Sequence, residues 1–267
     1  MRICCPVCQA PLKRERASWY CANGHNFDVA RQGYVNLLTA GQKHSKHPGD
    51  TRQMVAARKE FLDGGFYAPI ASEVVRLLEN EPLTSVLDAG CGEGYYLTEL
   101  SRSLPQAELV GVDISKDAVR YAAGRNPNAV WLTATAAKLP FAEASFDALL
   151  CMFAMTAAEE FRRVLKPGGV FLQVLAGPEH LMGLKNRIYP TILHKPKLLH
   201  SQYEGFVLDR TQTLEFSFEL VSGRQIQNLL AMTPHFWRIS REAAQKLQEL
   251  TQLTDTAQVI FNLYRAQ

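Results

Sequence analysis

The chain has 267 residues, of which 47% are hydrophobic, and carries a formal net charge of +3. This length predicts a main domain with an appendage rather than one small domain. The sequence shows no run of about 18 apolar residues and no secretory leader, so it predicts neither a membrane span nor a secretory signal. We therefore expect a cytoplasmic protein with no membrane partner.

Charge is distributed unevenly along the chain. Residues 1–66 hold ten basic and five acidic side chains, whereas residues 67–177 hold nine basic and thirteen acidic ones. The excess is again basic over 178–210, and charges balance over 211–267. Basic flanks around an acidic centre indicate either a polyanionic partner or an ordinary solvated surface.

Cysteines crowd the start of the chain. Cys5, Cys8, Cys21 and His25 have the spacing C-x2-C-x12-C-x3-H, which presents three thiolates and an imidazole to one tetrahedral zinc ion. Cys4 is an alternative to Cys5, although the Cys5 spacing forms the better knuckle. Protein ligands fill all four positions, so the predicted zinc is structural and activates no water.

Basic and aromatic residues lie between the two ligand pairs, namely Lys13, Arg14, Arg16, Trp19 and Tyr20. Such residues can hold phosphates and stack on bases, or the aromatics can simply pack under a solvated hairpin. Both interpretations remain open at the level of sequence.

A polar loop and two helices follow. Residues 41–50 show no apolar periodicity and predict a loop. Apolar side chains at helical spacing predict one helix from Thr51 to Asp63, ended by Gly64, and a second from Tyr67 to about Leu78.

The most informative stretch runs from Val86 to Gly94, an apolar run that ends in Asp88 and three alternate glycines, Gly90, Gly92 and Gly94. It predicts a strand, a tight turn and a helix whose first N–H groups are free for a ligand. A dinucleotide fingerprint needs a third glycine at position 95, which is Tyr95 here. Asp88 would repel a pyrophosphate and suits a cationic cofactor, such as S-adenosylmethionine.

A second apolar segment ends in Asp113, 19 residues beyond Gly94. Folds of this kind place a carboxylate at this point to bind the ribose hydroxyls, so we expect Asp113 to contact the cofactor. Ser115 then caps a helix.

Strand and helix patterns alternate from Ser85 to Leu175, which predicts an α/β fold with a doubly wound, mostly parallel sheet. The predicted strands are 85–88, 109–113, 130–133, 146–151 and 170–175, the last entered through a Lys-Pro-Gly-Gly turn at 166–169, followed by 213–221 and 257–265. Helices are expected around 223–231 and 240–250.

These segments together resemble the bacterial 23S ribosomal RNA guanine-N1 methyltransferases of the RlmA type. The matching stretches are Cys5-Pro6-x-Cys8, Cys21-x3-His25, Gly33-Tyr34-Val35-Asn36-Leu37-Leu38, Pro48-Gly49-Asp50, Phe61-Leu62-Asp63, Asp88-x-Gly90-Cys91-Gly92-Glu93-Gly94-Tyr95-Tyr96, Leu139-Pro140-Phe141, Lys166-Pro167-Gly168-Gly169 and Gly177-Pro178-x-His180-Leu181-Met182. They extend from residue 5 to residue 182.

The resemblance implies a Rossmann-like, S-adenosylmethionine-dependent methyltransferase core with a small zinc-binding domain ahead of it. It implies methylation of N1 of one guanine in a hairpin loop of 23S ribosomal RNA, by a homodimer that carries one zinc per chain. By matching position, the cofactor would contact Tyr67, Gly92, Glu93 and His180.

The expected division of the chain is a zinc-binding, RNA-recognition module over 1–34, a linker loop and helices over 35–84, and the methyltransferase domain over 85–267. An insertion over 177–210 is expected to cover the active site. The rival functions are a small-molecule methyltransferase and a non-catalytic, zinc-dependent RNA-binding protein.

Two positions depart from the usual pattern of such enzymes. Thr135 stands where many of them carry an acid for the adenine amino group, and Met152-Phe153-Ala154-Met155 stands where a tyrosine and a proline are usual. The sequence therefore names no residue that holds the guanine and no catalytic residue. Asp50 and Glu93 are the alternatives for a proton acceptor.

Overall fold

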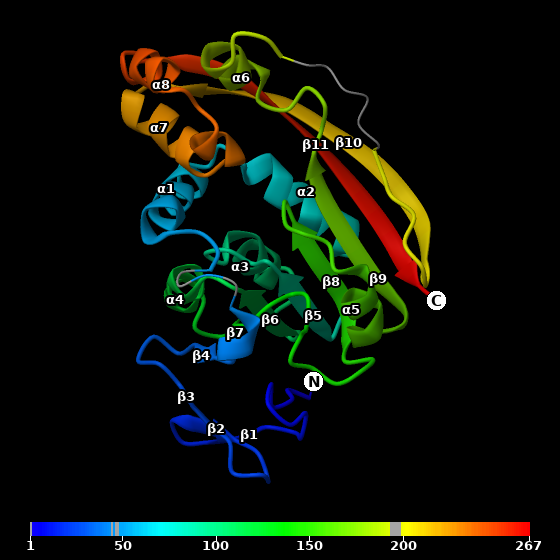
Figure 1. Cartoon of the computed structure of the whole chain (residues 1–267). Coiled ribbons are helices and arrows are strands. Elements are labelled where there is room, and N and C mark those ends of the chain that lie inside the picture. Colours follow the sequence, from blue (N-terminus) through cyan, green and yellow to red (C-terminus); the bar gives the residue numbers. More distant parts are fainter. Residues whose placement is uncertain (1, 44, 46–47, 193–198) are drawn as a thin grey trace.

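A computed structural model describes residues 2–43, 45, 48–192 and 199–267 of the chain. Two sheets organise it: a small one close to the N-terminus and a large one that carries most of the remaining chain (Figure 1). Parts of the expected loop 41–50 and of the expected insertion 177–210 fall on residues 44, 46, 47 and 193–198, outside the described residues.

The N-terminal sheet is a short antiparallel meander of β1 (Lys13–Glu15), β2 (Ser18–Tyr20) and β3 (Asn26–Asp28). We call the N-terminal segment that holds this small sheet the ribbon. Backbone contacts attach it to residues 140 and 141 of the larger part of the chain. The N–H of Cys4 donates to the carbonyl of Pro140 at 2.8 Å, and Ile3 forms a β-bridge with Phe141. The ribbon is therefore packed against the core rather than tethered by a free linker.

The large sheet has eight strands in the order β10-β11-β9-β8-β5-β6-β7-β4. Their bounds are β4 Val35–Asn36, β5 Ser85–Ala89, β6 Glu108–Asp113, β7 Val130–Thr133, β8 Phe146–Met152, β9 Leu165–Ala176, β10 Phe206–Leu220 and β11 Leu253–Ala266. The strands from β4 to β9 in this order are parallel, and β11 and β10 add an antiparallel edge. The predicted doubly wound, mostly parallel sheet is confirmed.

The chain leaves the centre of this sheet in two directions. From β5 it continues to β6 and β7 on one side, and β8 and β9 lie on the other side. Ligands of such sheets bind outside the carboxyl ends of the strands at this switch point. The turn after β5 therefore occupies the expected position for a cofactor site.

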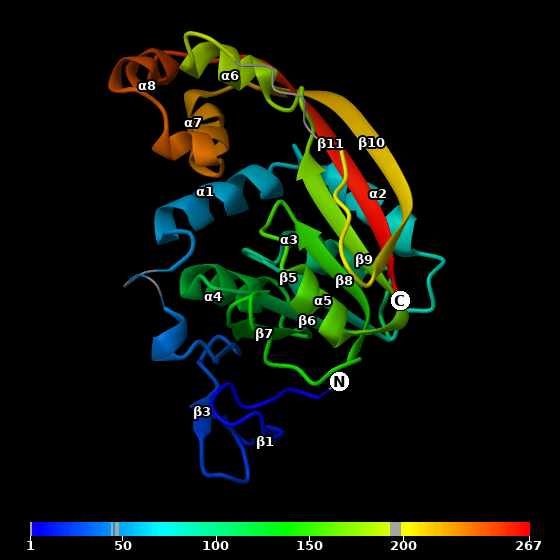
Figure 2. The same cartoon turned by 45° about the vertical axis from the view of Figure 1, so that its right-hand side comes forward.

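Eight α-helices and two 3₁₀ turns are present among the described residues. They are α1 Arg52–Asp63, α2 Ala68–Leu78, α3 Tyr95–Ser101, α4 Lys116–Arg125, α5 Ala158–Val164, α6 Met182–Ile188, α7 Gly223–Ala231 and α8 Arg241–Gln248, with η1 Ala40–Gln42 and η2 Pro234–Trp237. Figures 1 and 2 show α1, α6, α7 and α8 grouped at the end of the molecule away from the N-terminal ribbon. None of these helices is long and apolar enough to cross a membrane.

Side-chain caps explain where several helices begin. The hydroxyl of Thr51 accepts from the N–H of Met54 at 3.4 Å, and that of Ser115 accepts from Ala118 at 3.3 Å. Such caps satisfy N–H groups that have no partner within the helix. The predicted helix starts at Thr51 and Ser115 are confirmed.

Two strand predictions were too short. The expected strands 213–221 and 257–265 belong to an antiparallel pair that is continuous from Phe206–Ala266 to Leu220–Leu253, apart from one irregularity near Leu208. Residues 206–210, read from their turn signals as part of the insertion, therefore belong to β10. Cross-strand pairing with β11 overrides their local propensity.

The Lys-Pro-Gly-Gly segment at 166–169 also lies within a strand, β9. β9 begins at Leu165, which pairs with Phe146, and the next pair joins Val170 to Ala148. Residues 166–169 thus bulge out opposite a single residue of β8, and Gly168 takes a φ of +76° there. The predicted turn exists as a bulge within β9.

Trp131 determines how closely the central strands pack. Its side chain is 1% exposed, and a Cβ added at Gly111 would lie 2.2 Å from its ring. A Cβ at Gly94 would lie 2.7 Å from the same ring and 2.9 Å from Ala122. The indole therefore fills the space that these two glycines leave open.

We predict that Gly111→Ala destabilises the protein by about 1–3 kcal/mol, because the added methyl overpacks the core against Trp131. Gly124→Ala is the matched control, since nothing lies within 4 Å of a Cβ there. It should be neutral or stabilise α4 by up to about 1 kcal/mol. Urea unfolding measures both, and equal stability of the two variants would contradict this packing.

Candidate functional site

The turn between β5 and α3 requires its glycines. Gly90, Gly92 and Gly94 have φ values of +87°, +55° and +82°, a region that residues with side chains rarely adopt. A Cβ at Gly90 would also lie 2.6 Å from the Cβ of Ala154. The N–H groups of Gly90 and Cys91 donate to the carbonyl of Val112 at 2.8 and 3.0 Å, which ties the turn to β6.

Asp88 lies at the end of β5 directly beneath this turn. Its side chain is 1% exposed, and neither carboxylate oxygen has a hydrogen-bond partner among the described residues. Burial, together with the negative charges of Asp113 and Glu93, raises the pKa of Asp88 to about 8. A buried, unpartnered carboxylate is costly, and a cationic ligand beside it would remove that cost.

Asp113 connects the glycine turn to α4. One carboxylate oxygen accepts from the N–H of Gly92 at 2.9 Å, and the other accepts from the N–H of Ser115 at 2.8 Å. Each oxygen keeps a further lone pair for a ligand hydroxyl. The structure thus places Asp113 beside the turn, where a ribose contact is expected.

The side chain of Glu93 forms an ion pair within the protein. Its carboxylate is buried and bonds to Arg125, with Nη2 at 2.7 Å and Nε at 2.8 Å. Arg125 also pairs with Asp63 at 2.8 Å. The Glu93 side chain is engaged with the protein, so its expected cofactor contact remains a prediction.

Asp50, the other alternative for a proton acceptor, forms an ion pair with Arg58 of α1. Its carbonyl accepts from the hydroxyl of Ser115 at 2.7 Å. The segment before α1 is therefore attached to the loop that follows Asp113. Both acceptor candidates are held by an arginine, and neither carries a free carboxylate.

Tyr67 and His180, 113 positions apart, meet in the fold. The Tyr67 hydroxyl lies 3.2 Å from Nε2 of His180, whose Nδ1 lies 3.0 Å from the carbonyl oxygen of Gln258. A carbonyl only accepts, so Nδ1 carries the proton and Nε2 accepts from Tyr67. Burial raises the pKa of Tyr67, which keeps it a donor. The two residues implied by the resemblance thus form one hydrogen-bonded unit.

Phe153 belongs to the run 152–155, to which the sequence alone assigns no role. It follows β8 with a φ of +53°, and a bulky residue in that region indicates strain that the surroundings must support. Its ring centroid lies 6.1 Å from that of His180, 6.4 Å from Tyr96 and 6.5 Å from Tyr67. The side chain is still 39% exposed. An accessible aromatic surface therefore stands beside the Tyr67–His180 pair.

The predicted zinc ligands come together at the base of the ribbon. One ligand atom from each of Cys5, Cys8, Cys21 and His25 lies within 4.8 Å of all the others. Sγ of Cys21 is 3.6 Å from Sγ of Cys8 and 3.4 Å from Nδ1 of His25. Thiolates bound tetrahedrally to zinc lie about 3.8 Å apart, so these residues fit the ion. Cys4 is outside the cluster, and the alternative to Cys5 is removed.

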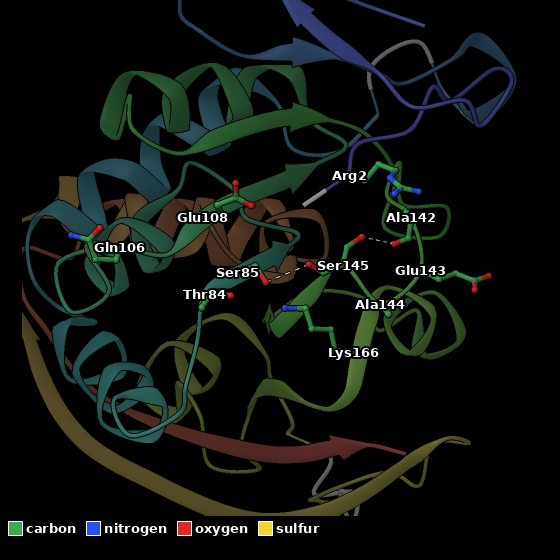
Figure 3. Close-up of a pocket in the computed structure, with 10 residues that line it drawn as sticks. All are labelled: Arg2, Thr84, Ser85, Gln106, Glu108, Ala142, Glu143, Ala144, Ser145 and Lys166. Atoms are coloured by element: carbon green, nitrogen blue, oxygen red, sulfur yellow. Dashed lines mark hydrogen bonds between the residues drawn. The ribbon is translucent and has the colours of Figure 1, made fainter. Parts of the chain in front are cut away.

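A cavity of about 570 Å³ lies at the amino ends of the central strands, away from the glycine turn at their carboxyl ends. Figure 3 shows the residues that line it. It is lined by the amino ends of strands, including Ser85 and Glu108, and by Lys166 from the bulge of β9. Cofactors of parallel sheets bind at carboxyl ends. This cavity is therefore separate from the site formed by Asp88 and the glycine turn.

The fold and the site define a Rossmann-like methyltransferase that uses S-adenosylmethionine and carries a structural zinc ribbon. Comparison with known families agrees, because residues 3–46 match the model of the RlmA N-terminal zinc ribbon and residues 86–169 match that of a methyltransferase domain.

Related proteins narrow this class further. The chain is 40% identical, over 69% of its length and 68% of the relative's, to a protein of Micromonospora griseorubida named "Putative 23S rRNA (guanine-N(1)-)-methyltransferase". It is 40% identical to the 23S rRNA (guanine(748)-N(1))-methyltransferase of Streptomyces fradiae, over 67% of the chain and 65% of that protein. A similarly named protein of Bacillus subtilis, YxjB, is 27% identical over 96% of the chain and 94% of its own length. The chain belongs to the RlmA family of 23S ribosomal RNA guanine-N1 methyltransferases.

We predict that the purified protein holds one zinc ion and that Cys21→Ser removes it and unfolds the ribbon, because three ligands no longer close the tetrahedral site. Elemental analysis measures the metal, and near-ultraviolet circular dichroism follows Trp19 and Tyr20. Ala10→Ser, on the loop after Cys8, should retain the ion. Zinc-free protein prepared without chelators would contradict the prediction.

Asp113→Ala should weaken S-adenosylmethionine binding by about 1.5–3 kcal/mol, the contribution of a hydrogen bond to a charged group. The same change frees the N–H groups of Gly92 and Ser115, which adds to the loss. Titration calorimetry measures the dissociation constant. An unchanged value would exclude Asp113 as a cofactor contact.

Proposed function

We propose that the protein transfers the methyl group of S-adenosylmethionine to N1 of a specific guanine in a hairpin loop of 23S ribosomal RNA. The observation that carries this proposal is the unpartnered, buried Asp88 below a three-glycine turn, in a chain that also holds a four-ligand zinc ribbon. The family to which the chain belongs supports the same substrate.

The proposed cofactor contacts are Tyr67, Asp88, Gly90, Gly92, Glu93, Gly94, Asp113 and His180. Asp88 balances positive charge, and the glycines let the backbone approach the ligand closely. Asp113 binds hydroxyls with its remaining lone pairs. Tyr67 and His180 form one wall of the pocket. The bound cofactor supplies an electrophilic methyl group, and the pocket holds it in line with the incoming nitrogen.

Phe153 is the proposed platform for the target base. A base in a loop must leave its stack to reach an enclosed site, and aromatic side chains replace part of the lost stacking. The exposed ring of Phe153 lies at the carboxyl end of β8, beside the Tyr67–His180 pair. Its strained backbone is consistent with a functional position.

Guanine N1 loses a proton as the new bond forms. Asp50 and Glu93 are held by Arg58 and Arg125, so we assign neither as the acceptor. Binding and positioning by the residues named above are then the protein's main contribution to the rate.

We further propose the division into a zinc-binding, RNA-recognition module over 1–34, a linking segment over 35–84 and a methyltransferase domain over 85–267. The excess of basic residues over 1–66 supports an RNA role for the first part. A homodimer and a cytoplasmic location complete the proposal, by analogy with the family and with the place of its ribosomal substrate.

The experiment is methylation of 23S ribosomal RNA from a strain that lacks the modification, with isotope-labelled S-adenosylmethionine. We expect label at one guanine and a stop in primer extension there, because an N1 methyl blocks base pairing. Phe153→Ala should lower the rate at least tenfold with an unchanged cofactor dissociation constant, and Phe153→Tyr should restore it. Label found only in a small molecule would overturn the assignment, as would cofactor binding with no methyl transfer to RNA.

A further inference from the structure

A second hollow, of about 480 Å³, lies on the side of the molecule formed by α1 and α4. Four cationic side chains line it, Arg52 and Lys59 from α1 and Arg120 and Arg125 from α4, and no acidic residue does. Gln32, at the end of the zinc ribbon, completes the wall. All three proposed parts of the protein thus contribute to one basic surface, which we call the α1–α4 hollow.

Two of these cations have no acid to balance them. Lys59 and Arg125 share Asp63, and Arg125 also pairs with Glu93. Among the described residues, no ion pair joins Arg52 or Arg120 to an acid, and both side chains are exposed. Placing several cations around one hollow costs repulsion that an anionic ligand would offset.

One residue that lines the hollow, Gly124, is a glycine. Gly124 lies within α4, where glycine costs about 1 kcal/mol relative to alanine. It does not have a positive φ, and nothing lies within 4 Å of a Cβ built there. Neither backbone strain nor packing therefore requires a glycine. A side chain can therefore be added at this position without a clash, so position 124 is suited to a test of the charge in the hollow.

The α1–α4 hollow is linked to the cofactor turn. Arg125 lines the hollow and bonds through its guanidinium to Glu93, between Gly92 and Gly94. On α1, Lys59 faces the hollow, whereas its neighbour Arg58 lies 3.7 Å from a Cβ built at Gly92. Arg125 therefore connects the hollow to the glycine turn of the proposed cofactor site.

We propose that the α1–α4 hollow binds backbone phosphates of the RNA substrate next to the target nucleotide. The inference rests on the proposed function. Guanidinium groups bind phosphate oxygens bidentately, Tyr121 in the lining offers a stacking surface, and the open shape suits a polymer. Contacts of this kind position the RNA without reading its sequence.

The test adds a negative charge without a steric clash. Gly124→Glu should weaken binding of a 23S ribosomal RNA transcript at least tenfold, because its carboxylate would stand among the four cations. Gly124→Ala is the matched control and should bind the transcript as the unchanged protein does. Both variants should keep the same dissociation constant for S-adenosylmethionine and remain folded, which thermal unfolding checks.

A second pair of variants removes charge instead. Arg52→Gln with Arg120→Gln should reduce the slope of log affinity against log salt by about 1–2, as expected for one or two lost phosphate contacts. Arg210→Gln, on the exposed edge strand β10, removes one charge elsewhere and should change the slope less.

The outcomes separate this inference from the proposed function. If the unchanged protein methylates ribosomal RNA while Gly124→Glu and the double arginine variant bind RNA normally, the hollow is not an RNA site and the proposed function stands. If the variants lose RNA affinity but no RNA is methylated, the hollow is supported and the proposed function fails.

Discussion

Three carboxylates are gathered around one tight turn, and the arrangement of the site depends on how each is balanced. Glu93 is paired with Arg125, and Asp113 accepts two backbone N–H bonds. Asp88 has neither, although the negative charges of Asp113 and Glu93 both raise its pKa. Burial and mutual repulsion make this turn unfavourable until a cation joins it. The constraint explains why the pocket suits a cofactor with positive charge rather than a pyrophosphate.

The rest of the structure supports that turn from two sides. On one side, α1 contributes Arg58, and α4 contributes Arg125, which connects the glycine turn to Asp63. On the other side, the ribbon adds Ile3 and Cys5 to the apolar cluster that contains Phe141 and lies on the far face of the sheet. Removal of the ribbon would therefore uncover part of the core, so the zinc ion stabilises more than its own four ligands.

The site was predictable from sequence where its residues are close in the chain. Asp88, the glycines and the zinc ligands follow spacings that reflect local geometry, and the structure places each group together. The Tyr67–His180 contact joins residues far apart and was expected only from resemblance. No role could be assigned to Phe153 from the sequence. Its orientation depends on a positive φ, and the apolar residues around it in the chain give no sign of that backbone conformation.

Other features required the tertiary structure. The first residues of β10, 206–210, have a sequence typical of a loop, and only their pairing with β11 makes them a strand. The ion pair of Glu93 could not be predicted, because its partner Arg125 lies 32 positions later in the chain. The α1–α4 hollow joins two helices and the ribbon, so charge counts indicated a basic region without locating it. Electrostatic sites of this kind form by packing and leave no spacing in the sequence.

The central claim is that the charge of the cofactor satisfies Asp88, and proton release on binding tests it most directly. In the free protein, the pKa of Asp88 is raised to about 8, so the carboxyl is mostly protonated at pH 7. A cationic ligand lowers that pKa, so binding should release up to one proton and should tighten as pH rises from 6 to 8. Calorimetry of S-adenosylmethionine binding at pH 7, in two buffers with different ionisation enthalpies, measures the release. The account predicts a release by the unchanged protein that Asp88→Asn loses, whereas the same release from both proteins would contradict it.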